Sequence, residues 1–142
     1  MVFHYEIEIL GPRDVVRAFA LMQIVVPELD LETWTRLTAI ERHRRQWAVA
    51  KDAKGYIRGI FSMTPVKHRL FGDLLDVPIF ATASLVDERN ISREIIAFAR
   101  RWARQVGCRM IHLRSSAPAG LDIFETPASP PDTGFGLIYS VD

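Results

Sequence analysis

Basic and polar side chains gather where the longest amphipathic segment of the sequence begins. Arg89, Asn90, Ser92 and Arg93 lie close together at the start of a stretch whose apolar residues have helical spacing. Arginine pairs with phosphate oxygens, and the N–H groups at a helix N-terminus attract anions. These residues therefore indicate an anion site. The alternatives are that Asn90 only caps the helix, and that both arginines are solvated surface residues beside the acids at positions 87 and 88.

His112 is the second candidate for chemistry. It lies in the segment from Cys108 to Arg114, where apolar side chains favour a strand. An imidazole can relay a proton near neutral pH. The alternative is a histidine that is only packed and hydrogen-bonded. The four histidines and the single cysteine show no metal-ligand spacing, so no metal site is expected.

The composition restricts the class of protein. A chain of 142 residues with 49% apolar and 25% charged residues is typical of one globular domain. A net charge of +1, with basic clusters that lack interleaved aromatic residues, argues against nucleic-acid binding.

The longest apolar stretch, Leu74 to Val86, contains Asp76 and Pro78 and is shorter than the ~20 residues of a membrane helix. We expect no membrane segment. The acidic N-terminal segment and the lone Cys108 favour the cytoplasm.

The first part of the chain predicts one strand followed by two helices. Apolar and acidic residues alternate over residues 5–9, which indicates a half-buried strand. Asp14 and Asp30 are candidate N-caps. The helix after Asp14 ends near Pro27, and the second helix runs from Leu31 to about Arg42.

A hairpin follows these helices. The runs Trp47 to Lys51 and Tyr56 to Met63 are rich in residues that favour strands, and the turn-forming residues 52–55 separate them. The second strand can extend to Val66.

The next segments predict a strand, a helix and a strand. Val77 to Val86 is nearly all apolar or small, which is typical of a central strand. Ile91 to Val106 has one apolar stripe, with Asn90 as N-cap and Gly107 as the residue after the helix. The strand from Cys108 to Arg114 should then lie parallel to the first, as in a right-handed βαβ unit.

Beyond residue 115 the sequence is rich in proline and glycine, with a short helical or irregular piece over residues 121–125. Residues 134–139 predict a last strand. No repeat or composition break divides the chain, so residues 1–142 are expected to form a single domain.

This order of elements resembles the GNAT N-acyltransferase superfamily over nearly the whole chain. Gly55-Tyr56-Ile57-Arg58-Gly59 resembles the family's central hairpin. Residues 91–107, with Trp102 and the closing Gly107, resemble its third helix, and Gly134-Phe135 resembles its late Gly-Phe pair. The resemblance implies an α/β fold (α+β in stricter schemes) with a mixed central sheet flanked by helices.

The resemblance also implies a reaction and its site. Acetyl-CoA or another acyl-CoA would be the co-substrate, and a small-molecule or peptide amine would be the acceptor. The backbone at Leu85 and Val86 would hold the pantetheine arm. The segment through Arg89, Asn90, Ser92 and Arg93 would hold the pyrophosphate. His112, or a water molecule, would take the proton of the amine.

Two positions depart from the family's pattern. Asn90-Ile91-Ser92 stands where the family has Gly-x-Gly, and Asp87 stands where it has glutamine or arginine. Pro130 occupies the position of a tyrosine that protonates the leaving thiolate in many members. Two hypotheses follow: an acyl-CoA-dependent N-acyltransferase, or a catalytically silent domain that binds a ligand or a protein. The sequence also leaves open a homodimer.

Overall fold

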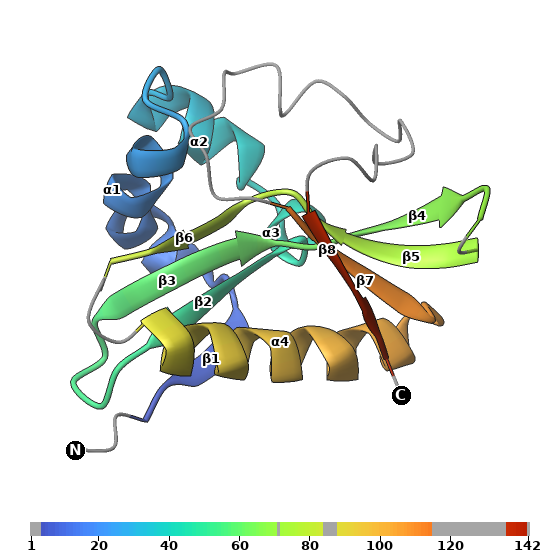
Figure 1. Ribbon diagram of the computed structural model, residues 1–142. Helices are drawn as coiled ribbons and strands as arrows, with labels where there is room; N and C mark the ends of the chain where they lie inside the picture. The colour runs from blue at the N-terminus through green and yellow to red at the C-terminus, as the bar shows by residue number, and fades with distance from the viewer. Residues whose placement is uncertain (1–3, 71, 84–87, 115–135, 142) are drawn as a thin grey trace.

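The computed structural model describes residues 4–70, 72–83, 88–114 and 136–141. Its helical segments are η1 (Pro12–Asp14), α1 (Val15–Val25), α2 (Leu31–Leu37), α3 (Glu41–Arg44) and α4 (Glu88–Gln105). Its strands are β1 (Glu6–Ile9), β2 (Trp47–Lys51), β3 (Ile57–Ser62), β4 (Thr64–His68), β5 (Gly72–Val77), β6 (Phe80–Thr82), β7 (Met110–Arg114) and β8 (Gly136–Ser140). Figure 1 shows their arrangement. Among the described residues, no helix is long and apolar enough to cross a membrane.

Two four-stranded sheets are joined through one bent hairpin. The first has the order β1-β2-β3-β6 and the second the order β4-β5-β7-β8. β3 continues into β4 across Met63, while β5 continues into β6 across Pro78 and Ile79. Pro78 has no N–H group to donate to a ladder, so it suits the position where the strand changes sheets. The predicted extension of the second hairpin strand is confirmed, with a break at Met63.

The parallel strand pair lies earlier in the chain than predicted. β5 pairs with β7 in parallel, from Leu74 opposite Met110 to Val77 opposite Leu113. β6 instead pairs with β3 and forms the edge of the other sheet. The prediction of a central strand from Val77 to Val86, parallel to Cys108–Arg114, is therefore wrong. The mixed sheet is confirmed, and its two halves separate where β5 ends.

Helices cover opposite faces of the strands (Figure 1). One buried cluster joins α1 and the Trp34 side chain of α2 to β2 and β3. Within it, the Trp34 and Trp47 rings pack edge to face with centroids 4.9 Å apart. A second cluster joins α4, through Ile91 and Ile95, to strands of both sheets. α4 therefore bridges the two sheets from below, as Figure 1 shows.

The predicted helix from Leu31 to Arg42 is divided in two. Asp30 caps α2 as expected, because its carboxylate accepts a hydrogen bond from the Thr33 N–H at 2.7 Å. At the other end, the Thr38 hydroxyl donates to the Trp34 carbonyl, a bond that competes with the helical pattern. The chain then starts α3 at Glu41.

The start of α4 differs from the prediction, and its end agrees with it. The helix begins at Glu88, so Asn90 lies inside the first turn and the prediction that it is the N-cap is wrong. At the other end Gly107 has φ +80°. Its N–H donates to the Arg104 carbonyl and the Cys108 N–H donates to the Ala103 carbonyl, which together form a Schellman motif. The predicted role of Gly107 is confirmed.

Candidate functional site

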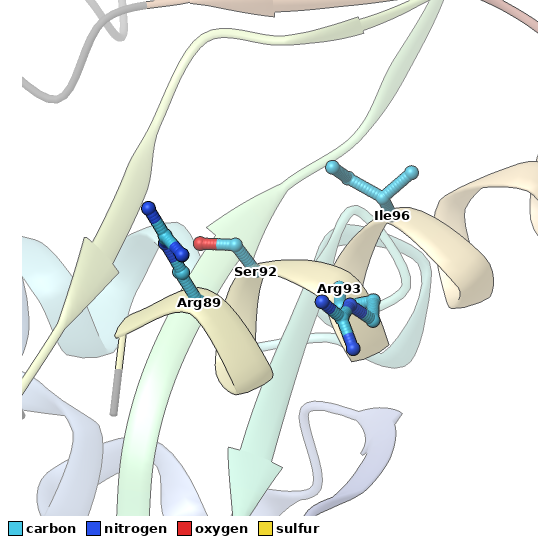
Figure 2. Close-up of a pocket in the computed structure, with 4 residues that line it drawn as sticks. All are labelled: Arg89, Ser92, Arg93 and Ile96. Atoms are coloured by element: carbon cyan, nitrogen blue, oxygen red, sulfur yellow. The ribbon is translucent and has the colours of Figure 1, made fainter.

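The first turns of α4 form one wall of a hollow with a volume of about 380 Å³. It is lined by Arg89, Ser92, Arg93 and Ile96 (Figure 2). These positions are three and four residues apart, so they share one face of the helix. Neither Arg89 nor Arg93 has an ion-pair or hydrogen-bond partner in the described part of the chain. Two guanidinium groups without a described partner and a hydroxyl therefore line this hollow beside the first turns of α4.

Close packing against the sheet sets the position of this helix end. Ile91 is fully buried, and a Cβ on Gly59 of β3 would lie 3.3 Å from its Cγ2 atom. The same Cβ would lie 3.4 Å from the carbonyl oxygen of Ala81 on β6. The absence of a side chain at Gly59 thus lets the first turn of α4 approach β3 and β6 together.

β6 has an edge that faces away from β3, and β6 lies against the same part of β3 as this helix end. The Ser62 N–H donates to the Ile79 carbonyl and the Ala83 N–H donates to the Arg58 carbonyl, so alternate residues of β6 bond to β3. Phe80 and Thr82 lie between these positions, and their N–H and C=O groups point away from β3. In the described residues no strand pairs with this edge. An extended ligand with amide groups could bond to it.

His112 forms a buried pair with Asp76. The two residues face each other across β7 and β5, with Nδ1 of His112 3.2 Å from Oδ1 of Asp76. The histidine is 0% exposed and the aspartate 6%. Its Nε2 atom has no hydrogen-bond partner among the described residues. An imidazole held by a carboxylate, with its other nitrogen unpaired, has the arrangement of an oriented base.

The structure brings some of the predicted site residues together and separates others. Arg89, Ser92 and Arg93 share the hollow, while Asn90 does not line it. Ile111 packs in the α4 cluster, so His112, the next residue along β7, points to the opposite face of the sheet. Leu85 and Val86 lie outside the described residues, as do the segment 121–125 and Pro130.

Asp76 is a site residue that the sequence analysis did not identify. The sequence feature that points to it is that Asp76 is a lone charged residue in the apolar stretch from Leu74 to Val86. Such a charge needs a partner when it is buried. The partner, His112, could not be inferred because the parallel pairing of β5 with β7 was placed wrongly.

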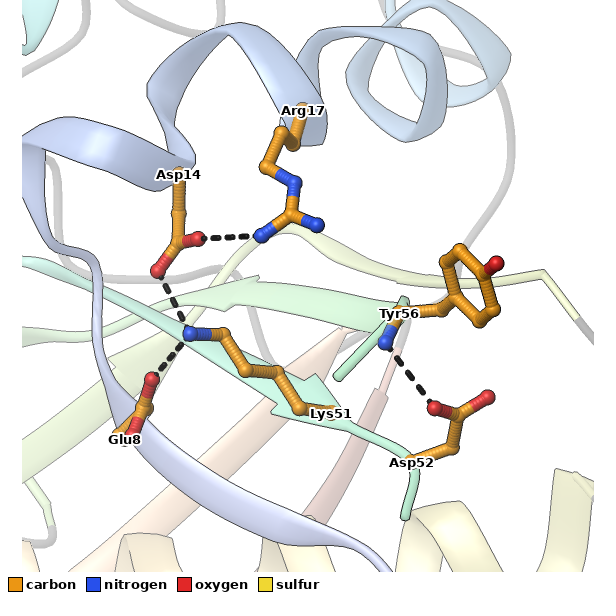
Figure 3. Close-up of polar contacts among 6 residues, drawn as sticks. All are labelled: Glu8, Asp14, Arg17, Lys51, Asp52 and Tyr56. Atoms are coloured by element: carbon orange, nitrogen blue, oxygen red, sulfur yellow. Dashed lines mark hydrogen bonds and ion pairs between the residues drawn. The ribbon is translucent and has the colours of Figure 1, made fainter. Parts of the chain in front are cut away.

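A second charged cluster lies at the start of α1 (Figure 3). Nζ of Lys51 is 2.8 Å from Oδ2 of Asp14 and also pairs with Glu8. These hydrogen bonds, that to Asp14 first, raise the pKa of Lys51 above its ordinary 10.5. The Asp14 carboxylate pairs with Lys51 and Arg17, and it accepts no capping hydrogen bond from the backbone of α1, the helix it was predicted to cap. The cluster ties β1, α1 and β2 together.

Two further groups, Asp52 and Cys108, have shifted pKa values. The Asp52 carboxylate accepts from Lys54 N–H, Tyr56 N–H and Arg58 Nε. The bond from Arg58 is the main cause that lowers the pKa of Asp52. Burial raises the pKa of the Cys108 thiol, which disfavours a thiolate nucleophile there. In the described residues no group of three or more candidate ligands could hold a metal ion.

Comparison with solved structures identifies the fold. A GNAT family acetyltransferase from Brucella melitensis, solved with acetyl-CoA, is 16% identical, with 95% of this chain and 94% of that chain covered and a TM-score of 0.55. A GCN5-related N-acetyltransferase from Kribbella flavida is 21% identical, covering 78% and 71%, with a TM-score of 0.60. An aminoglycoside 6'-N-acetyltransferase from Acinetobacter baumannii is 11% identical, covering 76% and 77%, with a TM-score of 0.62. The chain therefore has the GNAT fold.

The sequence matches no family model and no curated protein. At these identities the structural similarity establishes the architecture, and function has to be argued from the residues of the site.

Proposed function

We propose that this protein binds acyl-CoA and transfers the acyl group to an amine. The observation that carries the proposal is the hollow at the start of α4, where Arg89, Ser92 and Arg93 face one space beside a helix N-terminus. Guanidinium groups and the N–H groups at a helix N-terminus both bind phosphate oxygens. In the proposal these residues replace the glycine-rich loop of the superfamily, with Asn90 in the same helical turn.

The rest of the cofactor would lie along β6. The pantetheine arm carries two amides, and the backbone groups of Phe80 and Thr82 face away from β3 where such amides could bond. Leu85 and Val86 would continue this contact, as the resemblance implies. Solved neighbours with the same fold support the proposal, because the Brucella enzyme holds acetyl-CoA and an aminoglycoside N-acetyltransferase holds CoA.

The proposed reaction is a direct transfer within a ternary complex. The amine nitrogen attacks the thioester carbonyl, a C–N bond forms and the C–S bond breaks. The nitrogen loses a proton to His112 or to a water molecule, and the departing thiolate takes a proton, so that the products are an amide and free CoA. The acceptor is an amine of a small molecule or a peptide.

Thermal unfolding with acetyl-CoA tests the binding step. A ligand that binds only the folded state stabilises it by about 2.7 kcal/mol at a hundredfold excess over Kd. For a chain of this length that corresponds to a rise in Tm of several degrees. Arg89→Ala combined with Arg93→Ala should abolish most of the rise, and added salt should weaken it because the contacts are charged.

Arg13→Ala combined with Arg42→Ala is the matched control. Both side chains are exposed and neither lines the hollow, and the variant carries the same change in net charge. It should keep the full rise in Tm. An equal loss in both double variants would mean that only overall charge matters. No rise in the parent at millimolar acetyl-CoA would overturn the proposal.

One observation favours a second candidate, a GNAT-fold domain that binds a ligand without catalysis. His112, the proposed base, is completely buried. Release of free CoA across a panel of amines distinguishes the two functions. A protein that gains stability from acetyl-CoA yet releases no CoA with any amine would be the silent binding module.

A further inference from the structure

The Asp76–His112 pair has an asymmetry that the proposed reaction does not explain. Both side chains are buried, and Nδ1 of His112 lies 3.2 Å from Oδ1 of Asp76. Nε2 of the same ring is buried without a hydrogen-bond partner in the described part of the chain. Buried polar atoms are nearly always paired, so an unpaired nitrogen calls for an explanation in a ligand, a water molecule or a reaction.

The contact with Asp76 determines which nitrogen carries hydrogen. When the Asp76 carboxylate is ionised it only accepts hydrogen bonds, and Nδ1 is then the donor. A neutral imidazole has one donor and one acceptor nitrogen, which leaves a lone pair on Nε2. A base needs such a lone pair, and its orientation is kept by the bond at the other nitrogen.

The two residues also lie where the sheets separate. Asp76 and His112 are direct partners in the parallel ladder, and that ladder ends one position later, at Val77 and Leu113. Beyond this point the chain of β5 passes through Pro78 into β6, in the other sheet. The imidazole is thus anchored at the end of the paired region, where the chain leaves β5 and passes into the other sheet.

We infer that Asp76 is a positioning residue that holds His112 with hydrogen on Nδ1, so that Nε2 accepts the proton of the attacking amine. This inference rests on the proposed acyl transfer. The amine, or one bridging water, is then the missing partner of Nε2. As the C–N bond forms, the proton moves from nitrogen to Nε2; as the C–S bond breaks, the thiolate takes a proton from solvent, and His112 returns its own to solvent.

Nitrogen NMR of the protein labelled at histidine tests the tautomer without any reaction. The ring signals of His112 are identified by their loss in His112→Gln, since the other histidines at positions 4, 43 and 68 remain. We expect hydrogen on Nδ1 and an unprotonated Nε2 in the parent at neutral pH. Asp76→Asn should lose this preference, because an amide can donate to Nδ1 and favour hydrogen on Nε2. Hydrogen on Nε2 in the parent would overturn the inference.

Kinetics of the same variants test the role. Asp76→Asn should lower kcat on the order of 10²- to 10⁴-fold, the usual contribution of a general base, with little change in KM for acetyl-CoA. Asp76→Glu keeps the carboxylate and should restore part of kcat. A kcat equal to that of the parent in Asp76→Asn, or a loss that Asp76→Glu does not relieve in a folded variant, would overturn it. Failure of the proposed function is seen separately, as no rise in Tm of the parent with acetyl-CoA.

Discussion

Ile91, in the first turn of α4, occupies the space that a side chain at Gly59 of β3 would need. A Cβ on Gly59 would lie 3.3 Å from Cγ2 of Ile91, a distance at which the neighbour has to move. Because Ile91 is fully buried and lies between Asn90 and Ser92, movement at this contact would also move the residues that line the hollow.

Gly59→Ala should destabilise the protein and weaken acetyl-CoA binding together. Extra volume in a packed core costs about 1–3 kcal/mol, while removing a strand glycine gains back about 0.5–1 kcal/mol, so a net loss of about 1 kcal/mol is expected. Urea unfolding measures it. Gly11→Ala is the control, because its Cβ would meet only Asp14 Oδ2 at 3.8 Å, an ordinary contact. Equal stability of Gly59→Ala and the parent would contradict the close packing.

Gly107→Ala should destabilise the C-terminus of α4 by about 1 kcal/mol, because a residue with a Cβ is strained at positive φ. Gly107 has φ +80° and no atom within 4 Å of an added Cβ, so backbone conformation is the only cause. Gly107→Asn should cost less, since asparagine tolerates this conformation. Thermal unfolding should give the highest Tm for the parent, a lower Tm for Gly107→Asn and the lowest Tm for Gly107→Ala. A different order would contradict the Schellman motif.

Lys51→Met should lower the free energy of unfolding by about 1–3 kcal/mol at neutral pH, because the buried Asp14 keeps only an exposed arginine 3.5 Å away. The pKa of Lys51 is raised above 10.5 in the folded state. The stabilisation that the Lys51 ion pairs contribute is therefore complete below pH 10.5. It is lost as the pH rises through the higher pKa that Lys51 has in the folded state.

Urea unfolding at several pH values measures this effect. The difference between parent and Lys51→Met should stay constant from neutral pH to about pH 10 and shrink above that. Arg17→Ala removes only the exposed arginine 3.5 Å from Asp14 and should change stability by less than about 0.5 kcal/mol. A difference that grows at alkaline pH would contradict the assigned ion pairs.

Local sequence signals predicted most helices and strands. The errors lie where contacts between residues far apart in the sequence determine the structure. Asp30, Gly107 and the hairpin around Asp52 act through bonds within a few residues, and all three were predicted. The strand from Val77 to Val86 was wrong because its apolar pattern was followed past Pro78. A proline inside an apparently central strand argues against that assignment.

The candidate site, like the fold, was predictable only where its residues lie close together in the sequence. Arg89, Ser92 and Arg93 share a helical face, and helical periodicity alone brings them together. The pairing of His112 with Asp76 and of Lys51 with Asp14 joins residues 36 and 37 positions apart in the sequence, which no local pattern reports. The single domain over residues 1–142, the cytoplasmic location and the homodimer stay predictions.

Amide chemical shifts during titration with acetyl-CoA test the proposed binding mode most directly. The largest changes should occur at Phe80 and Thr82, on the free edge of β6, and at residues 89–93 of α4. The amide of Ala81, which faces β3, should change less, and amides of α1 should not change. Changes confined to α1 and α2, or none at millimolar acetyl-CoA, would contradict acyl-CoA binding at this site.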